Sequence, residues 1–422
     1  MFGDFRQRRA VWLQDIRKSH TAPGLFNSRK TCIFKTYAVI DTEKNYTRIL
    51  NALFLLNTIK DHRRGQGKRY DLAHVLQFSI MALLSNADSY RKIHDFIDTH
   101  RERLNEYFGL DWKKAPAYTT IRNIILNTSG SKLERVFREH GWVLAKEEAE
   151  GKFIHSDGKT LRGSFDNMNG INQLQVLSAF AGDCAIVLGH EEIEEKSNEI
   201  PAARKLMEEL GLSDYIFTFD ALHCQKETLQ VADETGNDVI AQVKKNQKIL
   251  LNDCKSIANT TIPDDVFTEP FEKKRNRIES RRAEVFLSPL LTDAEKWDSV
   301  EAVIKIDRLL QVFDTKKKEW KNSHETSFYI STTILDAKKI CLGIRGHWRV
   351  ENKNHYVRDV SMGEDRSRIR CNPQIFAKLR SFALNILRKN KVKNVNRELF
   401  KNGHGIVFMC EAMCRCQPCR TG

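Results

Sequence analysis

Residues 153–164 of the chain read FIHSDGKTLRGS. A short apolar run leads to Asp157, and two glycines and two cations follow within the next six residues. This pattern predicts a β-strand that ends at Asp157 and a turn rich in positive charge after it. A carboxylate in such surroundings is well placed to hold a metal ion against a phosphate group.

Two further acids stand in comparable positions. Residues 215–220 read YIFTFD, a β-rich run that again stops on an aspartate, Asp220, and residues 221–225 open what we interpret as a helix. Glu351 lies in the stretch GHWRVEN, residues 346–352, which has helical spacing. We therefore expect the fold to bring Asp157, Asp220 and Glu351 together.

Three carboxylates suit a magnesium-dependent site. Mg²⁺ prefers oxygen ligands and takes only one or two carboxylates per ion beside substrate phosphate. Two such ions, roughly 3.5–4 Å apart, can act on the attacking and leaving oxygens of a phosphodiester. We expect Asp157, Asp220 and Glu351 to hold Mg²⁺ or Mn²⁺ as a pair of ions. Three acids close behind Glu351 remain alternatives for the third ligand: Asp359, Glu364 and Asp365.

Four motifs, taken together, resemble a known family. They are HSDGKTLRGS at 155–164, DALHCQ at 220–225, VKKNQ at 243–247 and HWRVEN at 347–352. In order and spacing they are similar to the motif series of ISAs-type insertion-sequence transposases, the group of the DDE superfamily that includes the H-repeat-associated proteins. The similarity runs from about Asn51 to about Lys389. One departure is Arg358, which stands where the family usually has an apolar residue.

The resemblance implies a function and partners. It implies metal-dependent cleavage of DNA at the ends of a mobile element, followed by strand transfer into target DNA. The partners would be the terminal inverted repeats and the target, bound by a homodimer or a larger assembly because two ends must be joined. A bacterial protein of the cytoplasm, associated with the nucleoid, is expected.

Several polar residues near the acids are candidates for contacts with DNA. Lys159 and Arg162 follow Asp157, and Lys244, Lys245 and Asn246 follow a predicted strand, where cations would reach phosphate groups. His347, Trp348 and His355 flank Glu351. The alternatives are ordinary ones: solvated turns for the cations, structural roles for the histidines, and core packing for the tryptophan.

Composition agrees with a protein that binds nucleic acid. Lys and Arg number 69 and Asp and Glu 55 among 422 residues, so the formal net charge is +14, which favours a polyanionic partner. No apolar run reaches the roughly 18 residues of a transmembrane helix, and residues 1–9 lack the apolar segment of a secretory signal.

The ten cysteines form no disulfide framework, so we expect reduced thiols in most of the chain. Four of them crowd the last thirteen residues with the spacing Cys-x3-Cys-x-Cys-x2-Cys, which departs from the paired units of structural zinc sites. These four are Cys410, Cys414, Cys416 and Cys419.

The pattern of elements predicts an α/β fold. Strands are expected at 153–157, 174–180, 185–190, 215–220 and 238–243, with a helix over 199–210, which describes a ribonuclease-H-like sheet. In that fold the first and fourth strands are neighbours, so Asp157 and Asp220 would meet. We also expect an amphipathic helix over 376–387.

Four segments follow from this reading. They are an irregular basic leader (1–44), an all-α N-terminal domain that could bind DNA (45–148), a catalytic domain (149–390) with a β-rich insertion at about 251–331, and a basic, cysteine-rich tail (391–422).

Two other functions remain open. The unusual leader and tail allow a transposase relic that binds DNA without cutting it. A nuclease with the same three acids and no strand transfer is the second.

Overall fold

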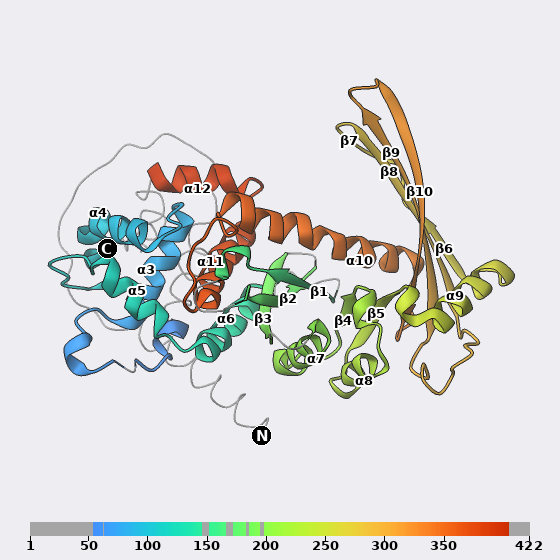
Figure 1. Ribbon diagram of the computed structural model, residues 1–422, viewed down its shortest axis with the longest axis horizontal. Helices are drawn as coiled ribbons and strands as arrows, with labels where there is room; N and C mark the ends of the chain where they lie inside the picture. The colour runs from blue at the N-terminus through green and yellow to red at the C-terminus, as the bar shows by residue number, and fades with distance from the viewer. Residues whose placement is uncertain are drawn as a thin grey trace, which may run out of the picture. The chain divides into compact units, whose positions relative to one another are not determined.

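The computed structural model describes residues 54–61, 63–145, 152–165, 172–182, 185–194 and 198–404 (Figure 1). The predicted leader and the four clustered cysteines lie outside these residues. The backbone of 349–352 is described, but the side chains of these residues are not.

Helices make up most of the two ends of the described chain, and strands its middle. The helices are α3 (Leu72–Leu84), α4 (Tyr90–Phe108), α5 (Tyr118–Leu126), α6 (Gly130–Ala145), α7 (Glu199–Leu210), α8 (Lys226–Glu234), α9 (Lys248–Thr260), α10 (Ala337–Val350), α11 (Pro373–Lys389) and α12 (Val395–His404). The strands are β1 (Phe153–Thr160), β2 (Gln175–Ala181), β3 (Ile186–Ile193), β4 (Ile216–Phe219), β5 (Asp238–Val243), β6 (Asp265–Thr268), β7 (Glu272–Lys274), β8 (Arg277–Leu287), β9 (Ala302–Asp314) and β10 (Glu319–Ser331).

All ten strands belong to one mixed sheet, in the order β3-β2-β1-β4-β5-β10-β9-β8-β6, with β7 paired to β8. β1, β2 and β3 form the predicted antiparallel meander. β4 lies parallel to β1, and β5 lies parallel to β4. The prediction that the first and fourth strands are neighbours is confirmed.

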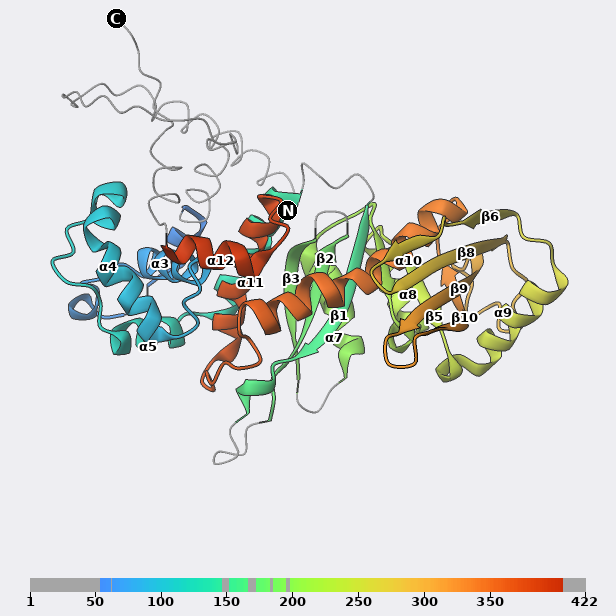
Figure 2. The same cartoon turned by 90° about the horizontal axis from the view of Figure 1, so that it is seen from above.

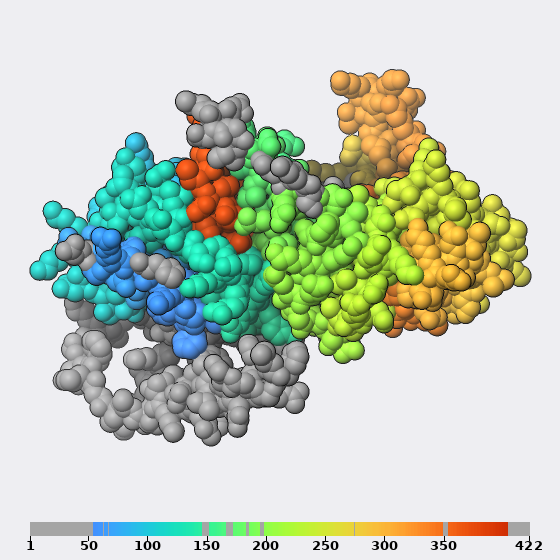
Figure 3. All heavy atoms as spheres, turned by 60° about the horizontal axis from the view of Figure 1, so that its bottom comes forward, coloured from blue at the N-terminus to red at the C-terminus, as the bar shows by residue number. Residues whose placement is uncertain are grey.

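Residues between β5 and α10 extend this sheet. After α9, β10 pairs with β5 in antiparallel fashion from Phe328↔Val243 to Ser331↔Ile240, while residues 319–327 of β10 pair with β9 instead. β9 and β10 therefore run past β5 as a long hairpin (Figure 1). In Figure 3 the far end of this hairpin, drawn in orange, stands out from the surface.

The N-terminal helices share a hydrophobic core with the C-terminal ones. Side chains of α3, α4, α5 and α6 pack in one cluster with side chains of α11 and α12. α11 is buried on nearly all sides, so the prediction of an amphipathic helix is wrong. Its polar residues point into the protein because partners await them there, as Asn385 shows by bonding both the N–H and the carbonyl of Val187 at 2.8 Å.

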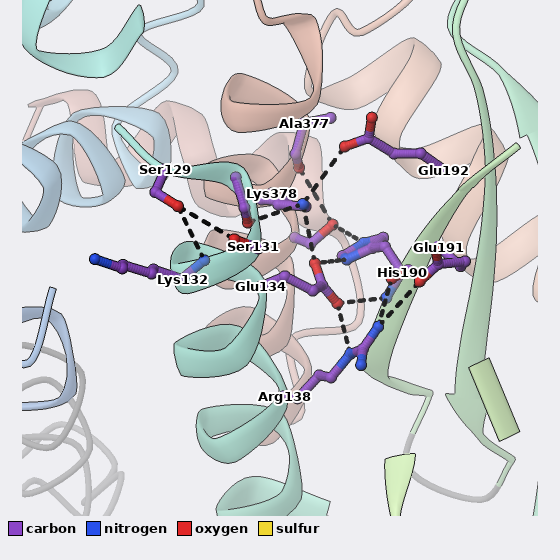
Figure 4. Close-up of polar contacts among 12 residues, drawn as sticks. Ser129, Ser131, Lys132, Glu134, Arg138, His190, Glu191, Glu192, Ala377 and Lys378 are labelled. Carbon is purple, nitrogen blue, oxygen red and sulfur yellow. Dashed lines mark hydrogen bonds and ion pairs between the residues drawn. The ribbon is translucent and has the colours of Figure 1, made fainter. Parts of the chain in front are cut away.

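A buried ionic cluster joins α6, β3 and α11 (Figure 4). Glu134 accepts hydrogen bonds from the His190 backbone N–H at 2.6 Å and from Arg138 at 3.1 Å. The Lys378 ammonium lies 3.4 Å from the same carboxylate, and the His190 ring bonds Ser381 at 2.9 Å. We call Glu134, Arg138, His190 and Lys378 the closed cluster. It fixes three segments that are distant in sequence.

The described cysteines are free thiols: Cys224, Cys254 and Cys341 are buried and Cys371 is exposed. Among the described helices, none combines the length and apolar character required to cross a membrane.

Candidate active site

The parallel pairing of β1 and β4 brings two of the predicted acids to the same level. The register runs from Phe153↔Ile216 to His155↔Thr218, a constant offset of 63 residues. The same offset leads from Asp157 to Asp220. Two carboxylates that are distant in sequence therefore stand on adjacent strands at one edge of the sheet.

The strand that carries Asp157 is longer than predicted. β1 continues to Thr160, because residues 157–160 keep pairing with residues 175–178 of β2 after the pairing with β4 has ended. The predicted turn directly after Asp157 is wrong. Asp157 instead projects from an extended strand, where side chains two residues apart lie on the same face.

This face of β1 lies against α10 and the helical residues that follow it (Figure 2). The His155 ring packs so tightly on Gly346 that a Cβ atom there would overlap it. Asp157 contacts His355, and Lys159 contacts Asp359. The two stretches that carry these partners are π-helical, η5 (Glu351–His355) and η6 (Val357–Ser361). Such helical bulges are frequent at functional sites.

Asp157 is kept ionised by its neighbours. Its Oδ2 lies 3.0 Å from His355 Nε2, and its side chain is 34% exposed. Burial raises the pKa of Asp157, but the hydrogen bond to His355 and the charges of His355 and His347 lower it further, so that the net pKa is below its usual value. The carboxylate is therefore available as an anionic ligand at neutral pH.

Asp220 is more exposed and partly engaged. Its Oδ1 accepts a hydrogen bond from Leu222 N–H at 3.1 Å and caps η3 (Ala221–His223), a single helical turn that precedes α8. The predicted helix thus begins as one 3-10 turn. Oδ2 of Asp220 has no hydrogen-bond partner among the described residues. It is free to bind a ligand.

A cavity of about 140 Å³ opens between the two acids. At roughly 30 Å³ per water, it has room for a few waters or a partly hydrated ion. Its walls come from β1, β4, β5, β10 and α10. The lining residues are Asp157, Thr218, Phe219, Asp220, Ile240, Gln242, Lys244, Tyr329, Ile344, His347 and Trp348.

A buried hydroxyl organises two histidines beside this cavity. Thr218 Oγ1 lies 2.5 Å from His155 Nδ1 and 3.1 Å from His347 Nδ1. Burial lowers the pKa of His347, although Asp157 and Asp220 oppose the shift. His347 is thus neutral at pH 7. Trp348, which is 47% exposed, adjoins it at the cavity wall.

The acids that were alternatives to Glu351 are already paired. Glu364 is buried, and its carboxylate lies 2.7 Å from both Lys159 and Arg358. Burial raises the pKa of Glu364, but the charges of Arg358, Lys159 and Arg380 hold it far below its usual range. Asp359 forms an ion pair with Lys159 as well. Arg358, unusual at its position, therefore supplies part of a buried ion pair.

The candidate DNA contacts differ in how free they are. Lys159 is nearly buried between Asp359 and Glu364. The Asn246 amide donates to the Ala221 carbonyl at 2.6 Å. Lys244 and Lys245 are exposed, and Lys244 lines the cavity.

Arg162, beyond the end of β1, is 76% exposed, and a guanidinium nitrogen lies 3.8 Å from Asp365.

The sequence analysis missed one acid near the site. The Glu199 carboxylate lies over Gly158, where a Cβ atom would overlap it, and 3.6 Å from His223 Nε2. Glu199 is the first residue of α7. An acid in the first turn of a helix is common, so the sequence gives no signal for a special position.

The described residues fit a divalent ion in part. Mg²⁺ takes one or two carboxylates and keeps several waters, and Asp157 and Asp220 beside the cavity meet that need. No group of three His, Cys, Asp or Glu side chains within the described part of the chain is placed to hold a metal. The Glu351 side chain lies outside that part.

Comparisons with known proteins agree with this site. Residues 156–386 match the family described as Transposase DDE domain, and residues 54–141 match the family described as DDE_Tnp_1-associated. YncI of Escherichia coli O157:H7, whose name describes it as a transposase, is 31% identical over 87% of this chain and 95% of its own length.

A second relative is YhhI of Escherichia coli K12, named as an H repeat-associated transposase, which is 30% identical over 80% of this chain and 90% of its own length. A cryo-EM structure of the piggyBac transposase synaptic complex with hairpin DNA aligns with a TM-score of 0.42 at 10% identity, over 90% of this chain and 83% of that chain. That similarity is too weak to establish a shared fold. The match over 156–386 and the relatives show that the chain belongs to the DDE transposase family, in the H-repeat-associated group.

Proposed function

We propose that this chain is a metal-dependent DNA transposase whose catalytic acids are Asp157, Asp220 and Glu351. The observation that supports this most is the offset of 63 residues between β1 and β4, which sets Asp157 level with Asp220 beside a polar cavity. The chain would cut DNA at the ends of a mobile element and transfer the strands to target DNA.

The catalytic part would be ribonuclease-H-like. The five strands β3-β2-β1-β4-β5 supply the meander and the two parallel, helix-linked strands of that fold. β6 to β10 would be an insertion between the fifth strand and the helix of the third acid. The N-terminal helices would form the DNA-binding domain predicted for residues 45–148.

Glu351 is proposed as the third acid because of its position on the helix. His347 and His355 stand four residues before and after it, and both act on Asp157. Residues four apart lie on one face of a helix. We expect Glu351 to share the face that these two histidines present to Asp157. The competing acids Asp359 and Glu364 already neutralise Lys159.

Mg²⁺ or Mn²⁺, as one or two ions, would stabilise the charge that develops on a phosphodiester. The side chains around the acids prepare them for this role. The bond from His355 fixes the orientation of Asp157, which stays ionised. His347 is held by Thr218 and adds no positive charge that would compete with a cation.

The strands would be positioned by the exposed polar groups near the acids. We assign this role to Lys244, Lys245, Arg162 and Trp348, with His347 and His355 closer to the reacting phosphate. Lys159 and Asn246 would instead support the site, because their side chains are engaged within the protein. Two element ends require two active sites, so a homodimer or larger assembly on DNA in the cytoplasm is expected.

The test is cleavage of a DNA duplex that carries the gene's own flanking ends, in Mg²⁺ and in Mn²⁺. Wild type is compared with Asp220→Asn and Glu351→Gln. Asp233→Asn is the matched control, because Asp233 is an exposed acid of α8 without an ion pair among the described residues. We expect cleavage by wild type and the control, and none by the two site variants.

Other outcomes would decide among the rival functions. Wild type that binds the ends but never cuts, with either metal, would indicate a DNA-binding relic. Cleavage without strand-transfer products would indicate a nuclease. Cleavage that survives in Asp220→Asn would contradict the assignment of this acid.

A further inference from the structure

A second, larger cavity lies away from the carboxylates. Its volume is about 590 Å³, and it is formed by the start of α4, by α5 and by residues 363–371. Four arginines line it: Arg122, Arg366, Arg368 and Arg370. We call it the arginine cavity.

The residues between η6 and α11 display three of these arginines on one side. Arg366, Arg368 and Arg370 are exposed, whereas Ser367 and Ile369 between them are partly buried. Ile369 packs against the core of the N-terminal helices. Alternation with a period of two is the behaviour of extended chain, in which every second side chain points the same way. The three guanidinium groups therefore face outward together.

The charge of this cavity is not neutralised within the protein. None of the four arginines forms an ion pair within 4.0 Å in the described part of the chain. Asp88, the one acid of the lining, is 2.9 Å from the Lys92 ammonium. Arginines that crowd together without acids repel one another, and a bound polyanion would relieve that repulsion.

Hydrogen-bond donors lie at the inner wall of the cavity. The Tyr90 hydroxyl is buried and has no partner among the described residues. Burial raises the pKa of Tyr90 to about 12 although Arg122 and Arg380 oppose the shift, so the hydroxyl keeps its proton. α4, which is 19 residues long, begins here, and the N–H groups of its first turn favour anions.

A buried arginine adds to the positive potential. Arg380 of α11 is 2% exposed, and its Nε and Nη2 atoms have no partner in the described residues. It borders a small neighbouring space of about 10 Å³ that Ser367 and Ile369 also line. The arginine cavity thus rests on a further uncompensated guanidinium.

The position of the cavity relative to Asp157 indicates its ligand. Gly163 packs on the Ser367 carbonyl so closely that a Cβ atom would overlap it, which ties residues 363–371 to the end of β1. From Asp157 to Gly163 the chain spans six residues, at most about 22 Å. At 3.4 Å per base pair, that distance is about six base pairs of duplex DNA.

We propose that the arginine cavity binds the phosphodiester backbone of the same DNA duplex whose end lies at the carboxylates, several base pairs from the cleaved bond. This inference rests on the proposed function. The cavity joins residues of both matched families, since Tyr90 and Arg122 lie within 54–141 and the other arginines within 156–386. DNA bound here would connect the two parts of the chain.

The test uses the full chain, without metal so that cleavage does not intervene. Affinity for a fluorescent duplex that carries the element end is measured by anisotropy across a range of salt concentrations. The variant is R366Q/R368Q/R370Q. The control is K316Q/K317Q/K318Q in the exposed turn between β9 and β10, which removes the same charge elsewhere. Circular dichroism verifies that both variants fold.

We expect the arginine variant to bind at least about tenfold more weakly and to lose about one unit of salt slope per phosphate contact, while the control changes little. Equal affinity and slope for the arginine variant and wild type would overturn the inference and leave the proposed function intact. Wild type that binds no duplex would overturn both.

A free nucleotide is the other source of phosphate. An ATP analogue that binds wild type but not the arginine variant, while duplex affinity stays unchanged between the two, would assign the cavity to a small molecule.

Discussion

Two clusters of an acid and a histidine can be compared within this protein. In the closed cluster, Glu134 is 6% exposed and its carboxylate is shared among His190, Arg138 and Lys378. In the candidate active site, Asp157 is about one-third exposed and His355 is its one side-chain partner within 4.0 Å among the described residues. The first carboxylate has no capacity left for a ligand, and the second has.

The pKa values of the two acids show that ionisation alone does not separate the clusters. Burial raises the pKa of Glu134, but His190, Lys378 and Arg138 lower it to about 2. Asp157 is also shifted downward. Both acids are charged at neutral pH. What differs is access: the closed cluster joins three helices and strands, whereas Asp157 borders a cavity. We infer a structural role for one and a chemical role for the other.

The largest expected effect is on activity, at the open site. Asp157→Asn should reduce DNA cleavage by about 10³-fold or more, because a metal ion contributes several kcal/mol to charge stabilisation and each 1.4 kcal/mol is a factor of ten. The free energy of unfolding should change by less than about 1.5 kcal/mol, since asparagine keeps a hydrogen bond to His355. Cleavage rates and urea unfolding of the same preparation measure both.

A large loss of stability in Asp157→Asn would break the comparison, because it would make the open site structural too. Wild-type cleavage by the variant would remove Asp157 from the catalytic group.

The reverse result is expected for the closed cluster. Glu134→Ala should destabilise the fold by about 3–5 kcal/mol, because it leaves the buried charge of Lys378 and Arg138 without a partner. Cleavage per folded molecule should be unchanged. The midpoint of urea denaturation gives the first quantity and the specific rate at low temperature gives the second.

Glu139→Ala provides the control, since Glu139 is a neighbouring acid of α6 that takes no part in the closed cluster. A Glu134→Ala protein that is as stable as this control would show that the cluster contributes no net stability.

A buried histidine without an acid sharpens the role of the partner. His140 is fully buried on α6, both ring nitrogens lack partners among the described residues, and burial lowers its pKa to about 4. The unfolded chain binds a proton near pH 6.5 and the folded chain does not, so stability should fall as pH drops from about 6.5 to about 4. The loss is on the order of 3 kcal/mol at pH 4.

His140→Leu should flatten this part of the stability profile, whereas His94→Leu should not. Unfolding free energies at pH 7, 6, 5 and 4 provide the measurement. Parallel profiles for wild type and His140→Leu would show that His140 is already protonated in the folded protein.

The sequence predicted the middle of the sheet because the information there is local. The run 215–220 and the helix 199–210 have clear periodicity, and β4 and α7 lie within those limits. The length of β1 could not be predicted, since residues 157–160 are strand only by pairing with β2.

Non-local partners also explain the other errors. Lys378 and Arg380 suggest an exposed face of α11, but both are buried among residues from other segments. The arginine cavity escaped notice for the same reason, because its walls come from three stretches of the chain. The positions of acids on strands were predictable, whereas the partners that make them open or closed were not.

The smallest expected effect concerns the histidine of the open site. His355→Gln removes the partner that lowers the pKa of Asp157 and leaves burial, which raises it. Because Asp157 must be ionised to bind a cation, the acid limb of the cleavage profile should move to higher pH, while the rate at pH 8 falls about tenfold or less. His324→Gln is the matched control: His324 lies 3.1 Å from Asp307 in the β9–β10 hairpin, an acid–histidine pair on the strands furthest from β1 in sequence order of the site. Cleavage measured from pH 5 to 9 should show the shift in the first variant alone. An unchanged acid limb in His355→Gln would mean that His355 does not tune Asp157, and the open site would then differ from the closed cluster in access only.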